Sequence, residues 1–117
     1  MNVDIFTIIL INLPKLDEYD WYLSEKIGVS RTAKVFNALG SIVRLQILDM
    51  IKASKRPLHI KALSRNLNID YATIYRHIKT LELVGLISVY EVGRSRVIEI
   101  TEPTLINELI EKAKSIK

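Results

Sequence analysis

The chain has 117 residues, of which 49% are hydrophobic and 26% are charged. This length fits one compact domain, and so apolar a chain can bury a core, which excludes wholesale disorder. It contains no cysteine, so a disulfide framework, a thiolate metal site and a cysteine nucleophile are excluded together. The longest apolar stretch, Val3 to Leu13, is shorter than the roughly 20 residues that a membrane-spanning helix needs. No secretion signal is recognisable, and we expect a cytoplasmic protein without a membrane segment.

The positive charge is concentrated in the middle of the sequence. The formal net charge is +4. Residues 52–96 hold nine basic and three acidic side chains, a net of +6. Residues 1–51 hold five against six and residues 97–117 three against four, a net of −1 each. Such a concentration is typical of a surface that binds a polyanion. Solvated lysines and arginines scattered over a surface are the ordinary alternative, so the expected elements must decide.

The first 29 residues are the least regular part of the sequence. Val3 to Leu13 is rich in strand formers and ends at Pro14, which slightly favours a strand over a buried helix. Residues 15–29 mix acidic with aromatic side chains, and we expect a short helix there to stop at Gly28. We therefore assign residues 1–29 to an N-terminal extension that supplies a strand and dimer contacts.

Two helices are expected next. Ser30 is a suitable N-cap for a helix over residues 31–39, which Gly40 ends. Ser41 is a suitable N-cap for a second helix over residues 42–53. This second helix is apolar on nearly all sides, as is typical of a helix at the centre of a domain.

The next segment has the pattern of a helix-turn-helix. Apolar residues at helical spacing predict a short helix over residues 60–67, with His59 in its first turn. Asn68 tolerates the left-handed backbone that a tight turn requires. Asp70 is a suitable N-cap for a helix over residues 71–84. Two helices joined by so short a turn form a helix-turn-helix.

Two alternating runs of β-branched residues follow, over residues 87–91 and 96–101, and a tip containing Gly93 separates them. This pattern predicts a β-hairpin. Its buried face would carry Ile87, Val89, Ile98 and Ile100. Pro103 then opens a last helix over residues 103–117, whose apolar stripe requires a partner. The expected fold class is mainly α with a small β-hairpin wing, a winged helix-turn-helix over residues 30–101.

The helix over residues 71–84 separates a core face from a cationic face. On a helical wheel Ile74, Ile78 and Leu81 share one side, while Arg76 and Lys79 lie on the other. A DNA major groove admits such a helix, and its base edges offer acceptors to Arg, Lys, Thr and Tyr. We expect Tyr71, Thr73, Tyr75 and Arg76 to read bases, Lys79, Lys61 and Arg65 to hold phosphates, and Arg94, Ser95 and Arg96 to form the wing contact.

Several stretches resemble the ArsR-type winged helix-turn-helix regulators. Residues 38–48, ALGSIVRLQIL, are similar to that family's opening pattern ALGSPTRLRIL. Residues 63–69, LSRNLNI, and residues 73–87, TIYRHIKTLELVGLI, are similar to its run LAERLGLS…TVSRHLKKLEEAGLI. The resemblance covers about residues 30–101. It implies a homodimeric transcriptional repressor or activator, paired through its first and last helices, that binds a near-palindromic double-stranded DNA operator.

The resemblance also implies a dimer interface, but this sequence lacks the metal ligands that many members of the family have. Residues 102–117 would form a C-terminal dimerisation helix, and the interface would contain Val35, Leu105, Leu109, Ile110 and Ile116. Many members sense metals through a Cys pair where this chain has His59, Ile60 and Lys61, and others use His on the last helix, which has none here. We therefore expect no metal site and no cofactor. Abundant Ile and Lys without Cys favour an archaeal or thermophilic source.

Two other classes of function were weighed against a DNA-binding regulator. A winged-helix module that binds a protein of the transcription or replication machinery would use the apolar N-terminal run and the aromatic cluster Tyr19–Tyr22. A protein partner or an effector at this extension is also compatible with a regulator. An enzyme is the least favoured class, because no nucleophile elbow, phosphate loop, carboxylate pair or metal spacing is present. His77 lies on the core flank of its helix and is expected to pack there.

Overall fold

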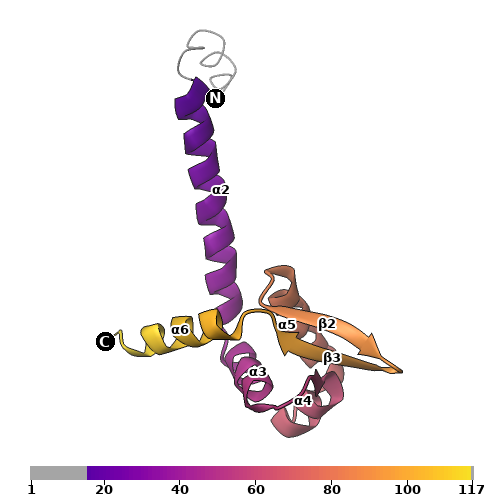
Figure 1. Cartoon of the computed structure of the whole chain (residues 1–117). Coiled ribbons are helices and arrows are strands. Elements are labelled where there is room, and N and C mark those ends of the chain that lie inside the picture. Colours follow the sequence, from indigo (N-terminus) through magenta and orange to yellow (C-terminus); the bar gives the residue numbers. More distant parts are fainter. Residues whose placement is uncertain (1–15, 117) are drawn as a thin grey trace. The chain divides into compact units, whose positions relative to one another are not determined.

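A computed structural model describes the chain over residues 16–116, with side chains from Lys26 onward (Figure 1). This part of the chain forms five helices and three strands. In order they are α2 (Leu16–Leu39), α3 (Ile42–Ala53), β1 (Leu58–His59), α4 (Ile60–Leu67), α5 (Tyr71–Leu83), β2 (Ile87–Val92), β3 (Ser95–Ile100) and α6 (Pro103–Lys114). The chain divides into two compact units, with the boundary between Lys34 and Val35. The strand expected at Val3–Leu13 lies outside the described residues.

The first described helix is longer than the sequence predicted. A helix stopping at Gly28 and a new helix beginning after Ser30 were expected, but α2 runs through both residues without a break. The prediction of two helices was therefore wrong. Glycine and serine lower helix propensity without preventing a helical backbone, and no proline interrupts the segment. The hydroxyl of Thr32 donates a hydrogen bond to the carbonyl oxygen of Gly28 at 2.8 Å, so this polar group is satisfied inside the helix.

The helix-turn-helix forms as the sequence predicted. The Ser41 side chain accepts a hydrogen bond from the backbone N–H of Arg44 at the start of α3, and Asp70 caps α5 in the same way. Asn68 ends α4 with φ at 55°, the left-handed conformation that the turn requires. Asn68 and Asp70 therefore leave only a short turn between α4 and α5, and residues 60–67 are helical as expected.

The sheet has three antiparallel strands in the order β1-β3-β2, one more than expected. The predicted hairpin is confirmed, and residues expected on its one face are partners across it, since Ile87 pairs with Ile100 and Val89 pairs with Ile98. Strand β1 is not predicted by the sequence pattern, and His59 lies in this strand rather than in the first turn of the helix as expected. Two residues are too few for a period of two to be recognised.

One hydrophobic core lies among the elements from the end of α2 to α6. Its buried members are Ala38, Ile47, Leu48, Ile51, Ile60, Leu63, Ile74, Ile78, Leu81, Leu86, Ile87, Ile98 and Ile106. The stripe predicted for α5 is completely buried, so its opposite face is left to solvent. The hairpin of β2 and β3 extends beyond the helices (Figure 1). None of the described helices is long and apolar enough to cross a membrane.

Candidate nucleic-acid interface

The exposed face of α5 presents polar and cationic side chains. Arg76 and Lys79 are exposed, as the helical wheel predicted, while Thr73 and Tyr75 are half-buried beside them. The buried face anchors the helix in the core, so the exposed side chains project from a rigid element. Their donors match the acceptors on the base edges of a major groove.

The start of α5 holds a chain of hydrogen bonds that orients Arg76. Asp70 accepts from the backbone N–H of Thr73 at 3.0 Å and from its hydroxyl at 2.8 Å. The Thr73 hydroxyl oxygen in turn accepts from a guanidinium nitrogen of Arg76 at 3.1 Å. The hydrogen bonds from Thr73, first its side chain and then its backbone, lower the pKa of the Asp70 carboxyl below its usual value. Arg76 is therefore held toward the N-terminal end of the helix.

The two tyrosines of α5 form a platform under the cations of the wing and of the helix. The rings of Tyr71 and Tyr75 are nearly parallel, with centroids 6.3 Å apart. The guanidinium carbon of Arg96 lies 4.9 Å from the centroid of the Tyr75 ring, and the ammonium of Lys79 lies 5.7 Å from it. Lys79 also pairs with Glu82 at 3.0 Å, and this hydrogen bond is the largest cause of the raised pKa of Lys79.

The wing tip turns through two residues. Gly93 has φ at 62° and Arg94 does not have a positive φ, and Val92 and Ser95 pair on either side. A glycine at the first position of a two-residue turn is typical of a type II′ hairpin turn. Arg94 is exposed in this turn. Arg96 is also exposed, but it lies over Tyr75, so the two arginines expected to act together at the tip differ in their surroundings.

A small cleft lies between the wing tip and the start of α4. Its volume is about 60 Å³. It is lined by His59, Ile60, Lys61, Tyr71, Arg94, Ser95 and Arg96. The structure thus brings together the predicted phosphate-binding Lys61, the three predicted wing residues and the predicted base reader Tyr71. The other two predicted phosphate ligands, Lys79 and Arg65, are exposed but do not line this cleft.

Arg44 links the start of α3 to the end of α2 and to α5 through its side-chain hydrogen bonds. Its guanidinium donates to the carbonyl oxygens of Ala38 at 2.6 Å and Asn37 at 3.2 Å, and a third nitrogen lies 3.1 Å from Nδ1 of His77. Because arginine only donates, His77 accepts through Nδ1. Burial is the largest cause of the lowered pKa of His77, followed by the charges of Arg44 and Arg76.

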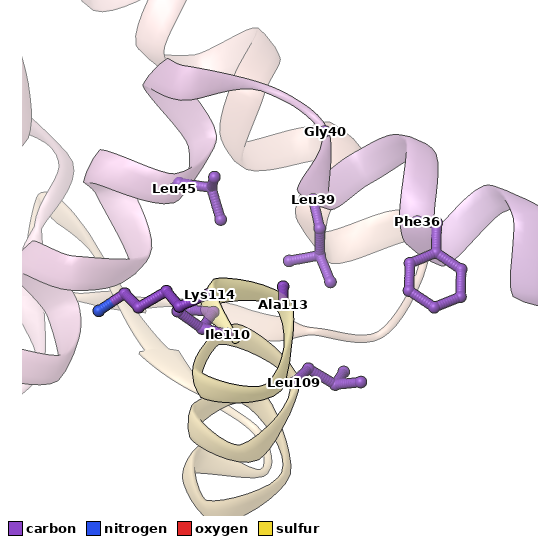
Figure 2. Close-up of a pocket in the computed structure, with 8 residues that line it drawn as sticks. All are labelled: Phe36, Leu39, Gly40, Leu45, Leu109, Ile110, Ala113 and Lys114. Atoms are coloured by element: carbon purple, nitrogen blue, oxygen red, sulfur yellow. The ribbon is translucent and has the colours of Figure 1, made fainter. Parts of the chain in front are cut away.

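A second, apolar cavity lies between the end of α2, α3 and α6. Figure 2 shows its lining residues, Phe36, Leu39, Gly40, Leu45, Leu109, Ile110, Ala113 and Lys114. Its volume is about 450 Å³. Phe36 lines this cavity and is 59% exposed.

The five residues expected in a dimer interface have three kinds of surroundings. Leu109 and Ile110 line the apolar cavity, while Leu105 and Ile116 are large exposed apolar side chains of the C-terminal segment. Val35 differs from them because it is half-buried and packs against the core of its own chain. Among the side chains that the structure describes, from Lys26 to Ile116, no three of His, Asp or Glu gather in a way that could hold a metal ion.

Comparison with known proteins identifies the domain. Residues 43–95 match the family model of the HTH domain, and no curated protein sequence matches the chain. Three solved structures are similar to this chain. Two coverages follow each identity: the covered share of this chain first, and that of the other chain second. The homodimeric winged helix-turn-helix DNA-binding domain of a Mycobacterium bovis protein has a TM-score of 0.68 and 20% identity over 77% and 83%. HlyU from Vibrio cholerae has a TM-score of 0.62 and 22% identity over 74% and 94%.

The third is described as an ArsR-family transcriptional regulator, with a TM-score of 0.57 and 23% identity over 72% and 92%. Each of these matches covers most of both chains. The chain thus has the winged helix-turn-helix fold of these solved structures, and its residues 43–95 match the HTH domain.

Proposed function

We propose that this protein is a homodimeric transcription regulator that binds specific double-stranded DNA in the cytoplasm. The observation that carries the proposal is the exposed face of α5, where Arg76 is oriented by Thr73 and flanked by the Tyr75 ring and Lys79. A recognition helix needs such a face on a helix anchored by its opposite side. In this proposal Thr73, Tyr75 and Arg76 read base edges in the major groove, while Lys79 and Arg65 hold phosphates.

The wing contributes a second contact to the same duplex. Arg94 and Ser95 lie at the tip of a hairpin that extends beyond the helices (Figure 1). A tip of this kind reaches the phosphates or the minor groove next to the major groove that α5 occupies. The pair formed by α5 and the wing therefore spans more DNA than the helix alone.

The apolar cavity supports the dimer in this proposal. Phe36, Leu109 and Ile110 line about 450 Å³ of apolar space. Leu105 at the start of α6 and Ile116 beyond its end are also exposed apolar side chains. Large exposed apolar patches are typical of interaction surfaces. Two copies paired there would present two recognition helices to a near-palindromic operator, with half-sites about one helical turn apart.

The test is to select bound duplexes from a random pool with the full chain. We expect a two-fold symmetric motif, because a symmetric dimer reads the same half-site twice. If each protomer neutralises about four phosphates, the slope of log affinity against log salt should be near −7. The absence of any enriched motif, or an affinity independent of salt, would contradict the proposal. The protein-binding module predicted from the N-terminal run would then be the hypothesis to pursue, by partner capture.

A further inference from the structure

We infer that the cleft between the wing tip and the start of α4 binds a single DNA backbone phosphate, and that Tyr71 donates to this phosphate instead of reading a base. The inference rests on the proposed function, and it assigns one phosphate of the bound DNA to one cleft of the protein. Its evidence is the meeting of Lys61, Tyr71, Arg94, Ser95 and Arg96 around one small space.

The charge of the cleft selects an anion. Three cationic side chains reach it from three elements: Lys61 from α4, Arg94 from the turn and Arg96 from β3. No aspartate or glutamate is among its lining residues. All three cations are exposed and none of them is in a described salt bridge. A carboxylate lies nearby on Glu91, which pairs with Arg96 across the hairpin but does not line the cleft.

The donors and the size of the cleft fit a phosphate. Ser95 and Tyr71 add hydroxyl donors to the cations, and a phosphodiester offers only acceptors to them. The volume of about 60 Å³ is enough for roughly four water-sized probes at about 10–15 Å³ each, which suits a compact tetrahedral group but not a base. The first turn of α4 has no side-chain cap from His59, so its N–H groups add favourable partial charge at the cleft.

The position of Tyr71 distinguishes it from the other residues of α5. Its ring stacks on Tyr75. Tyr71 also lines the cleft, together with the wing arginine Arg96. Thr73 and Arg76 do not line the cleft and stay on the face that would enter the groove. One helix thus supplies a phosphate donor at its first residue and base readers from its third.

The experiment couples one protein group to one DNA phosphate. The probe is the duplex obtained from the selection, synthesised with a neutral methylphosphonate at one backbone position at a time. Among the phosphates that the wild-type protein contacts in each half-site, we expect one at the cleft where neutralisation lowers affinity about ten-fold or more, as loss of a charge-assisted hydrogen bond does. In the variants Lys61→Ala, Arg94→Ala and Tyr71→Phe, the same position should lower affinity by only about two-fold.

Two controls separate the cleft from general charge and from misfolding. Lys112→Ala removes one positive charge from exposed surface on α6, and it should keep the full wild-type sensitivity at that phosphate. The thermal midpoint of each variant should match that of the wild type, since the substituted side chains are exposed or, for Tyr71, lose only a hydroxyl. Repeating the selection with Tyr71→Phe should return the wild-type motif.

The outcomes are distinct. If the variants bind more weakly but the methylphosphonate position keeps its full effect, the cleft holds no particular phosphate and the inference is wrong while the proposed function stands. If Tyr71→Phe changes the selected motif, Tyr71 reads a base and its assignment here is overturned. If the wild-type protein enriches no duplex at all, the proposed function fails and this inference fails with it.

Discussion

Arg76 and Lys79 are three residues apart on the same face of α5, yet their partners give them different roles. Arg76 is held by the Thr73 hydroxyl, which fixes the direction of a planar group able to bind guanine with two hydrogen bonds. Lys79 is shared between Glu82 and the Tyr75 ring, and its ammonium acts as a point charge. A fixed planar group favours base recognition, and a point charge favours phosphate binding.

We therefore expect opposite consequences from removing these two side chains. Arg76→Ala should relax sequence preference at one position by about 1–3 kcal/mol. Lys79→Ala should weaken binding evenly across sequences and reduce the salt slope by about 1. Competition binding to the selected duplex and to a random duplex, each over a salt series, measures both effects. Equal losses on the two duplexes for Arg76→Ala would show that it reads no base.

His77 gives the protein a defined response to acid. Its pKa is lowered in the folded state by burial first and then by Arg44 and Arg76, so between its folded pKa and about 6.5 the unfolded chain binds more protons. Stability should be complete above about pH 6.5 and should fall as the pH drops below that value. Urea unfolding between pH 5 and pH 8 should show a smaller fall for His77→Gln than for the wild type. An identical pH dependence in both proteins would contradict this role.

The surroundings of single residues were only partly predictable from sequence. Periodicity alone placed Ile74, Ile78 and Leu81 in the core and Arg76 and Lys79 outside it, because those positions depend on the helix itself. The contacts of Arg44 with His77, and of Arg96 with Tyr75, join residues that are far apart in the chain. No local pattern encodes such pairs, so the structure was needed to find them.

At the scale of elements, two glycines in equally open space should respond to alanine in opposite directions. A Cβ at Gly28 or at Gly93 would meet nothing within 4 Å, so backbone conformation alone decides. Gly28 is helical within α2, and Gly28→Ala should stabilise the helix by about 0.5–1 kcal/mol. Gly93 has a φ of 62°, and Gly93→Ala should destabilise the wing by about 1–2 kcal/mol.

Circular dichroism during thermal unfolding, together with hydrogen exchange of the β2 and β3 amides, can follow this pair of variants. The helical signal should rise for Gly28→Ala, and exchange in the hairpin should accelerate for Gly93→Ala. Faster exchange in the hairpin of the Gly28 variant, or no change in the Gly93 variant, would show that the backbone argument does not apply.

The elements that the sequence predicted best are those with strong end signals. Asp70 and Asn68 define the ends of α5 and α4, and the boundaries of these helices agreed with expectation to within one residue. Gly28 and Ser30 are weaker signals, because either residue is tolerated inside a helix, and they led to the wrong division of α2. Strand β1 depends on pairing with β3 rather than on its own two residues.

At the scale of the whole molecule, the proposed dimer should depend on the apolar cavity. Leu109→Glu would put a carboxylate among the lining residues Phe36, Leu39 and Ile110, where burial without a partner is costly. We expect this variant to sediment as a monomer at concentrations where the wild type is a dimer, and to lose most of its affinity for a two-half-site duplex. A wild-type mass for this variant would contradict pairing through the cavity.

Leu83→Glu is the matched control for this experiment. Leu83 is 84% exposed at the end of α5, and it does not line the cavity. The control variant carries the same change of charge and of size, and it should keep the mass of the wild type. A difference between the two variants would therefore report on the cavity and not on added negative charge.

The two-residue strand β1 affects the step at which the wing loses conformational entropy. Leu58 and His59 pair with Ile98 and Val97 of the wing strand and lead directly into α4. The wing and the first helix of the motif are therefore joined by a backbone ladder before any ligand arrives. A wing ordered only on binding would lose conformational entropy at that step, at about 0.5–1.5 kcal/mol for each immobilised side chain. In this protein the wing loses part of that conformational entropy when the chain folds, because the two residues of β1 pair with β3 at that stage. Less entropy is then lost when the protein binds its ligand.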